Sequence, residues 1–123
     1  MVNKTVLVVD DSPSIRGVVC AFLAENGYDM VSAENGKAAL ELLDGRRVHL
    51  CICDVQMPEM DGMEFVTAMK AMPDYRFVPV IMLTTEWTDE RKLQGRQAGA
   101  KAWFVKPFDP QKMLAAVARF ILP

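Results

Sequence analysis

The sequence predicts an α/β fold in which five parallel strands form one doubly wound sheet with helices on both faces. Short apolar runs rich in β-branched residues recur along the chain, and segments with helical periodicity separate them. Such runs are typical of strands buried on both faces. Strands that alternate with helices are joined by right-handed crossovers into one parallel sheet. The length of 123 residues suits one domain, and we expect residues 1–123 to form it.

Four of the expected strands lead directly into polar residues. The apolar runs cover residues 5–9, 30–33, 48–53, 78–83 and 102–105. All but the second are followed at once by a polar group, namely Asp10 with Asp11, Asp54, Thr84 and Lys106. The carboxyl ends of parallel strands share one edge of the sheet, where ligands bind. We therefore expect these side chains to converge there, although they are far apart in the sequence.

The first two helices are marked by their ends. Ser12 is an N-cap followed by proline at the first helical position, and Gly27 closes this helix. A second helix is expected between Gly36 and Gly45. The apolar stripe expected to face inward on the first helix is Ile15, Val18, Val19, Phe22 and Leu23.

The last three helices have equally clear starts. Asp61 with Glu64 forms a capping box for the third helix. The fourth is expected from Thr88 to Gly99, and Gly95 inside it should cost stability. The fifth starts at Asp109–Pro110. Its expected inward residues are Met113, Leu114, Val117 and Ile121.

Composition and charge exclude several classes of function. The net charge of −2 does not favour nucleic acid or anionic membrane as a partner. No apolar run is long enough to span a bilayer, and the N-terminus lacks the pattern of a signal peptide, so we expect a cytoplasmic protein. Cys20, Cys51 and Cys53 are expected to be reduced. A zinc site is not expected, because His49 is the only histidine.

The polar residues at the strand ends suit phosphoryl transfer. Three carboxylates in one crevice repel one another, and their oxygens are the ligands that Mg²⁺ prefers. A carboxylate beside such a cation can attack a phosphoryl group, whose oxygens Thr84 and Lys106 could help to neutralise. The sequence thus predicts a magnesium-dependent phosphoryl-acceptor site.

Four motifs resemble the receiver domain of two-component response regulators. They are Val8–Ser12, Cys53–Gly62, Leu83–Thr85 and Val105–Phe108, and the resemblance covers essentially the whole chain. It implies a flavodoxin-like sheet with the strand order 2-1-3-4-5.

The resemblance also implies a metal and an acceptor. Asp54 corresponds to the phosphoacceptor, Asp11 to a direct Mg²⁺ ligand and Asp10 to a ligand acting through water. The backbone carbonyl of Gln56 corresponds to a third protein ligand. Gly62 resembles the glycine that the family uses in the turn after the acceptor.

Other matching residues have implied roles in binding the phosphoryl group and in switching. Thr84 and Lys106 would contact the phosphoryl oxygens, and the Lys106–Pro107 bond would be cis. Thr84 and Trp103 would take part in a conformational switch, although plain core packing is the alternative for Trp103. Receivers usually carry a smaller ring at that position, and Ala or Gly where this chain has Thr85.

The receiver resemblance implies signalling partners rather than a conventional enzyme. A phosphohistidine on a sensor histidine kinase, or a phosphotransfer protein, would supply the phosphoryl group. An output protein would bind the face made by the fourth helix, fifth strand and fifth helix, and activation could produce a dimer. The chain would catalyse only its own phosphorylation and dephosphorylation. The single-domain form suggests a chemotaxis role, and a fragment of a larger regulator is the alternative.

Two other classes use related chemistry or a related fold. Phosphatases of the haloacid dehalogenase type also use an aspartate nucleophile at a strand end. They need a second aspartate two residues later as general acid and base, and Gln56 occupies that position. A flavin or nucleotide site would need a phosphate-cradling loop after the first strand, where Asp10 and Asp11 repel phosphate.

Overall fold

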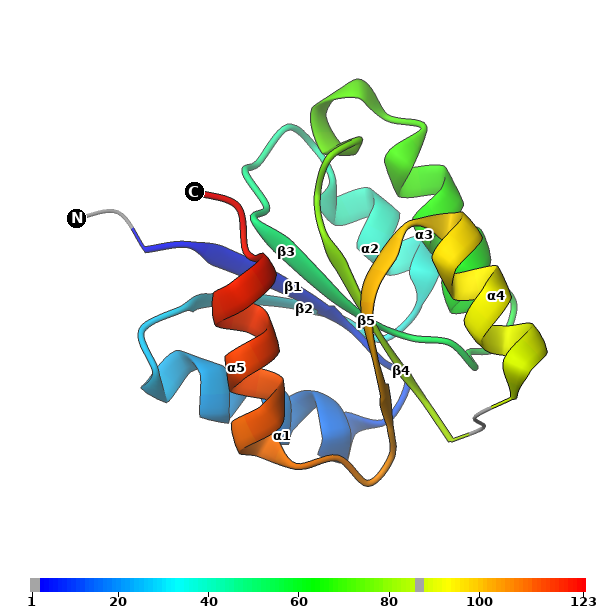
Figure 1. Ribbon diagram of the computed structural model, residues 1–123. Coiled ribbons are helices and arrows are strands. Elements are labelled where there is room, and N and C mark those ends of the chain that lie inside the picture. The colour runs from blue at the N-terminus through cyan, green and yellow to red at the C-terminus, as the bar shows by residue number, and fades with distance from the viewer. Residues whose placement is uncertain (1–2, 86–87) are drawn as a thin grey trace.

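The computed structural model describes residues 3–85 and 88–123, and a parallel five-stranded sheet forms its centre (Figure 1). The strand order is β2-β1-β3-β4-β5, and every neighbouring pair is parallel. This arrangement confirms the predicted flavodoxin-like α/β fold. The strands are β1 (Thr5–Val9), β2 (Asp29–Ala33), β3 (Leu50–Asp54), β4 (Val80–Thr84) and β5 (Ala100–Val105).

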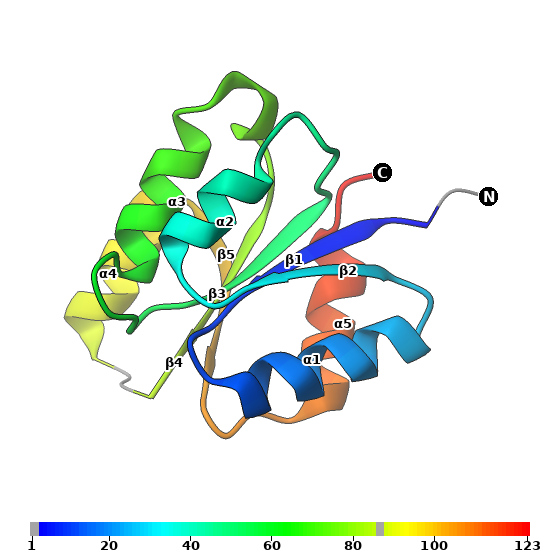
Figure 2. The ribbon, with the colours of Figure 1, turned by 180° about the vertical axis from the view of Figure 1, so that it is seen from behind.

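Helices cover both faces of the sheet. One face carries α1 and α5, and the other carries α2, α3 and α4, as the two opposite views show (Figures 1 and 2). The helices are α1 (Pro13–Glu25), α2 (Gly36–Leu42), α3 (Gly62–Lys70), α4 (Asp89–Ala98) and α5 (Pro110–Phe120), and a short 3₁₀ turn, η1, spans Pro73–Tyr75. Each face has its own hydrophobic core, and the strands separate the two.

Burial distinguishes the central strands from the edge strand β5. All five residues of β3 and of β4 are buried, as expected. The run 102–105 was expected to be buried on both faces, and this is wrong, because β5 is an edge strand that starts at Ala100 and is only partly covered. Lys101 and Val105 are exposed.

The helix starts agree with the sequence, whereas two details differ. Ser12, Asp61, Thr88 and Asp109 are N-caps, and Asp61 forms the expected capping box. Val18 does not face inward but is 56% exposed. Val19 and Leu23 are the buried residues of α1, which leaves Val18 at the margin of the apolar stripe. The helix α2 ends at Leu42, before the expected end at Gly45.

Gly95 provides the contact between α4 and β5. It is the only buried residue of α4. A Cβ atom at this position would lie 1.9 Å from Cζ3 of Trp103, so the ring occupies the space where a side chain would stand. The missing side chain of Gly95 therefore has a packing purpose besides its expected cost to helix stability.

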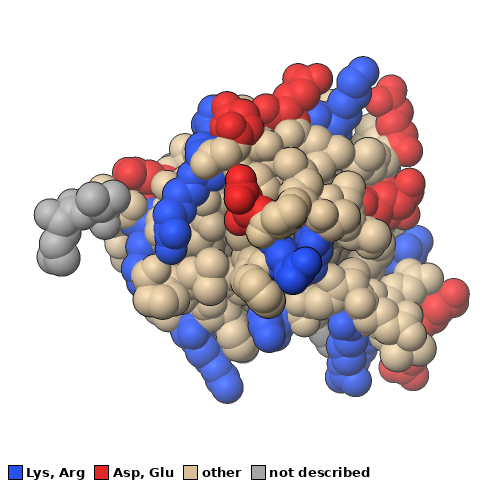
Figure 3. Space-filling view, turned by 90° about the horizontal axis from the view of Figure 1, so that it is seen from above, with Lys and Arg blue, Asp and Glu red and all other residues tan. Residues whose placement is uncertain are grey.

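The described residues contain no helix with the length and hydrophobicity needed to cross a membrane. On the face seen in Figure 3, Lys and Arg side chains are interspersed with Asp and Glu. That mixture agrees with the small net charge of −2.

Candidate functional site

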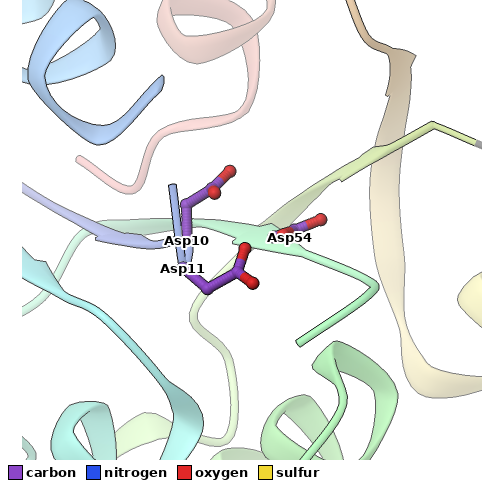
Figure 4. Close-up of side chains that lie close together, drawn as sticks. All are labelled: Asp10, Asp11 and Asp54. Atoms are coloured by element: carbon purple, nitrogen blue, oxygen red, sulfur yellow. The ribbon is translucent and has the colours of Figure 1, made fainter. Parts of the chain in front are cut away.

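Three carboxylates meet at the carboxyl ends of β1 and β3. The oxygens of Asp10, Asp11 and Asp54 lie within 4.8 Å of one another. The three side chains extend to the same side of the strand ends (Figure 4). Asp10 and Asp54 are buried, whereas Asp11 is exposed. The sheet thus brings together residues that are 44 positions apart, because β1 and β3 are neighbours in it.

Lys106 completes this cluster from the end of β5. Its Nζ lies 2.9 Å from Oδ2 of Asp10 and 3.3 Å from Oδ1 of Asp54. The Lys106 backbone N–H donates to the Thr84 carbonyl (2.8 Å), which ties the end of β5 to the end of β4. The Lys106–Pro107 bond is cis, as the sequence resemblance implied. Burial opposes the charge on Lys106, but hydrogen bonding to Asp10 and the charges of both aspartates raise its pKa.

The environment of Asp54 disfavours its negative charge. Burial first, and then the charge of Asp10, raise its pKa to about 6, while Lys106 and the Gln56 backbone N–H act in the opposite direction. A carboxylate pair of this kind is stabilised by additional positive charge. The donor set of three carboxylates, two of them buried and one exposed, fits a small hard cation such as Mg²⁺.

Hydrogen bonds to backbone groups hold the two loops that carry the aspartates. The N–H of Ser12 donates to Oδ1 of Asp10 (2.9 Å), and the Arg16 guanidinium donates to the Asp10 carbonyl (2.7 Å). After β3, the Gly62 N–H donates to the Val55 carbonyl (2.8 Å). A Cβ atom on Gly62 would lie 2.2 Å from the Asp54 carbonyl oxygen, so only glycine fits this close approach.

Gln56 and Thr85 are joined by a hydrogen bond that sequence reasoning missed. The Thr85 hydroxyl donates to Oε1 of Gln56 (2.5 Å), and the Gln56 backbone N–H donates to Oδ1 of Asp54 (3.3 Å). The loops after β3 and β4 are thus linked beside the candidate acceptor. Both positions were noted separately in the sequence, but only the fold shows that they touch.

The two residues expected to switch lie on neighbouring strands, two register positions apart. Thr84 is fully buried at the end of β4 and pairs with Val105. Trp103 pairs with Met82 on β4 and packs against the core of the α2, α3 and α4 face. Trp87, the second tryptophan of the chain, lies outside the described residues.

The cysteines do not form a metal site among the described residues. All three are free, and Cys51 and Cys53 lie fully buried in the same core. Burial raises the pKa of Cys51 to about 12. His49 is held elsewhere, since its Nδ1 accepts from the Thr5 N–H (3.0 Å).

The comparison with protein families agrees with this fold and site. Residues 6–118 match the response regulator receiver domain, and the chain belongs to this family. The chain is therefore a receiver domain, and its cluster of Asp10, Asp11 and Asp54 is consistent with phosphorylation-based signalling.

Several relatives and solved structures resemble the chain. Chemotaxis protein CheY4 of Vibrio cholerae is 42% identical, with a TM-score of 0.92, and the match covers 97% of this chain and 99% of that one. The phosphate regulon transcriptional regulatory protein PhoB of Pseudomonas aeruginosa is 34% identical, covering 94% of this chain and 50% of that protein. An uncharacterized 14.6 kDa protein of Leptolyngbya boryana is 33% identical, over 99% of this chain and 93% of that one. The chain thus spans about half the length of the curated PhoB relative.

Proposed function

We propose that this chain is a phosphorelay receiver in which Asp54 accepts a phosphoryl group from a phosphohistidine. The donor is a sensor histidine kinase or a phosphotransfer protein. The observation that carries the proposal is the position of Asp54, whose carboxylate lies beside those of Asp10 and Asp11 and 3.3 Å from the ammonium group of Lys106. A nucleophile, a group of cation ligands and a fixed positive charge are the parts that phosphoryl transfer requires.

The chemistry follows from these positions. An oxygen of Asp54 attacks the phosphorus, the N–P bond of the phosphohistidine breaks, and the imidazole keeps the electron pair and takes up a proton. Lys106, already 3.3 Å from Asp54, remains close enough to neutralise charge on the transferred phosphoryl oxygens. Asp10, Asp11, Asp54 and the Gln56 carbonyl would hold Mg²⁺, which would supply further positive charge to those oxygens.

Gln56 separates this proposal from the phosphatase alternative. Hydrolysis of an aspartyl phosphate by an enzyme needs a group that transfers a proton to and from water. The Gln56 carboxamide cannot do so, and the Thr85 hydroxyl binds its oxygen. We infer that the aspartyl phosphate persists and acts as a signal. The chain then turns over only its own phosphoryl group.

The output is proposed to be a change in partner binding. Thr84, at the end of β4, would move toward the phosphoryl group, and Trp103 on the neighbouring strand would respond. The partner would bind the face made by α4, β5 and α5, or a second copy would bind there after activation. A chemotaxis role, with residues 1–123 as one receiver domain, and a role as the receiver of a longer regulator are both compatible with these features.

Mass spectrometry of the intact protein tests the acceptor. After incubation with acetyl phosphate and Mg²⁺, the wild type should gain one phosphoryl group, and Asp54→Asn should gain none. Asp54→Asn should keep an unfolding free energy equal to or above that of the wild type, because one of three repelling charges is gone. Asp74→Asn, an exposed carboxylate of η1, is the control and should label normally. A phosphoryl adduct on Asp54→Asn would place the acceptor elsewhere.

A further inference from the structure

The turn that carries two aspartates after β1 is held by a cation from α1. The Arg16 guanidinium donates through Nη1 to the Asp10 carbonyl, at 2.7 Å. Asp10 is fully buried, so its carbonyl oxygen needs a partner from the protein. Within residues 3–85 and 88–123, Arg16 provides the one side chain that donates to this oxygen. The bond therefore satisfies a buried backbone group directly at the end of β1.

The hydrogen bond fixes a peptide group that belongs to both aspartates. The Asp10 carbonyl is part of the peptide plane that links Asp10 to Asp11, and this plane is rigid. A rotation of the plane would change ψ of Asp10 and φ of Asp11, and would redirect both side chains. Arg16 thus acts on the directions of two carboxylates, although it forms no ion pair with either of them.

The other restraints on this turn act on different atoms. The Asp10 N–H donates to the Ala33 carbonyl of β2 (3.2 Å), and the Ser12 N–H donates to Oδ1 of Asp10 (2.9 Å). Lys106 lies 2.9 Å from Oδ2 of the same carboxylate. None of these contacts replaces the donor to the Asp10 carbonyl. If Arg16 were removed, this buried oxygen would lose its partner, and the peptide would be free to turn toward water or another cation.

Arg16 has carboxylates in its surroundings with which it does not pair. Glu34 and Glu41 line the same surface pocket as Arg16. A guanidinium forms strong bidentate pairs with carboxylates, yet Arg16 forms no ion pair with any carboxylate of the described residues. Its guanidinium is directed to the Asp10 carbonyl instead. This choice of partner indicates a role at the acidic site rather than on the surface.

We propose that Arg16 is a positioning residue that holds the peptide between Asp10 and Asp11 in the orientation required for Mg²⁺ binding. The inference rests on the proposed function, because it adds a residue outside the acidic cluster to the same site. Groups that orient metal ligands without touching the metal change its affinity roughly 10–100-fold when they are removed. Charge alone gives the opposite expectation, since a guanidinium near the site repels Mg²⁺. The direction of the change in affinity therefore distinguishes positioning from simple electrostatics.

Thermal unfolding at a series of Mg²⁺ concentrations gives the Kd that tests this role. Arg16→Met keeps an apolar stem without a donor and should raise the Kd for Mg²⁺ about tenfold. Arg16→Gln, whose side chain is shorter than that of arginine, is a second variant and should also raise it. Arg16→Lys keeps a charge and a donor, so it should bind Mg²⁺ more tightly than Arg16→Met. Arg119→Met removes an exposed cation from α5 and is the control, for which the Kd should change less than about twofold. Melts without Mg²⁺ check that each variant is folded.

Phosphoryl labelling separates this inference from the proposed function. With acetyl phosphate, Arg16→Met should label Asp54 slowly at low Mg²⁺ and within about twofold of the wild-type rate at saturating Mg²⁺, because only the affinity for the metal is changed. An unchanged or lower Kd for Mg²⁺ in Arg16→Met and Arg16→Gln would overturn the inference even if Asp54 is labelled normally. A wild type whose melting does not depend on Mg²⁺, or an Arg16→Lys variant no better than Arg16→Met, would also overturn it. A raised Kd in the variants, with no labelling of Asp54 in the wild type, would instead reject the receiver chemistry and keep the role of Arg16 in metal binding.

Discussion

The acidic site and the α4–β5 edge differ in how firmly the fold holds them. At the site, Asp54 and Thr84 end strands whose residues are all buried, and Asp10 follows a strand of the central core. At the edge, β5 is only partly covered, and Gly95 is the one buried residue of α4. Phosphoryl transfer depends on side chains in fixed positions, which the buried strands provide.

The difference in packing indicates where a signal can appear. An element with few buried apolar contacts opens or shifts at a low free-energy cost. A small rearrangement at the ends of β4 and β5 would therefore move α4 and Trp103 before it disturbed the core. The proposed chemistry and the proposed output thus belong to parts of the molecule that differ in local stability.

Gly95→Ala should have the largest effect on the edge. The new Cβ atom would overlap the Trp103 ring, so the ring or α4 must move. We expect the free energy of unfolding to fall by about 1–3 kcal/mol, as for other overpacked sites. Denaturant unfolding measures this change, and quenching of Trp103 fluorescence in a Trp87→Phe background should increase. The rate of Asp54 labelling should remain within about twofold of the wild-type rate, a change of about 0.4 kcal/mol in the activation free energy.

Gly17→Ala is the matched control for that substitution. Gly17 is also inside a helix, but nothing lies within 4 Å of the position where its Cβ would be. Alanine should therefore stabilise α1 by about 0.5–1 kcal/mol. If Gly95→Ala stabilised the protein as Gly17→Ala does, the contact with Trp103 would not be what holds the edge.

Removal of Mg²⁺ tests the acidic site, which the buried strands hold more firmly than they hold the α4–β5 edge. At a Mg²⁺ concentration ten times its Kd, the free energy of unfolding should rise by about 1.4 kcal/mol, and a chelator should reverse the gain. Asp11→Asn should lose most of this gain, since Asp11 is the exposed carboxylate of the cluster. Thermal melts with and without Mg²⁺ measure both effects, with Asp74→Asn as the control. A wild type that melts identically in both conditions would contradict the metal site.

Thr85 lies between the two regions, and its replacement should have a smaller effect. Thr85→Ala removes both the bulk and the hydroxyl that binds Gln56. Labelling of Asp54 by acetyl phosphate should become faster by up to about tenfold, since a hydrogen bond contributes roughly 0.5–1.5 kcal/mol. Thr85→Val keeps the bulk and removes only the hydroxyl. Faster labelling in Ala alone would indicate a steric effect, faster labelling in both would indicate the hydrogen bond, and unchanged rates in both would reject a role for Thr85.

The sequence predicted the sheet and the residues that meet at its edge, because both depend on local patterns. Apolar runs marked the strands, and capping residues such as Ser12 and Asp61 marked helix starts. The acidic cluster followed from the rule that parallel strands share a carboxyl edge. The strand order and the individual roles relied on family resemblance.

What the sequence did not predict depends on contacts between distant elements. The ring of Trp103 against Gly95 and the hydroxyl of Thr85 on Gln56 each join residues from separate elements. Gly95 could be recognised only as a weak helix former, because nothing local indicates which ring will approach it. The partial exposure of β5 was missed for a similar reason, since a run of apolar residues does not tell an edge strand from a central one.

His49 lies at the opposite end of the sheet from the acidic site. Its protonation should have the smallest effect on the free energy of unfolding. Burial first, and then the charges of Arg47 and Lys4, lower its pKa below the usual 6.5. Protonation would turn Nδ1, which accepts from the Thr5 N–H, into a donor. A lowered pKa in the folded state means that stability is present above pH 6.5 and is lost as the pH falls through the folded-state pKa.

The measurement is best made in an Asp54→Asn background. The raised pKa of Asp54 has the opposite sign, since its contribution is present at low pH and is lost as the pH rises through about 6. With Asp54 replaced, the free energy of unfolding should fall by up to about 1 kcal/mol from about pH 7.5 to about pH 5.5, the order of one hydrogen bond. Adding His49→Gln should flatten this dependence, because an amide does not titrate. If the unfolding free energy of the His49→Gln variant depended on pH as before, other groups would be responsible for the pH dependence. Protonation of His49 would then not weaken this end of the sheet.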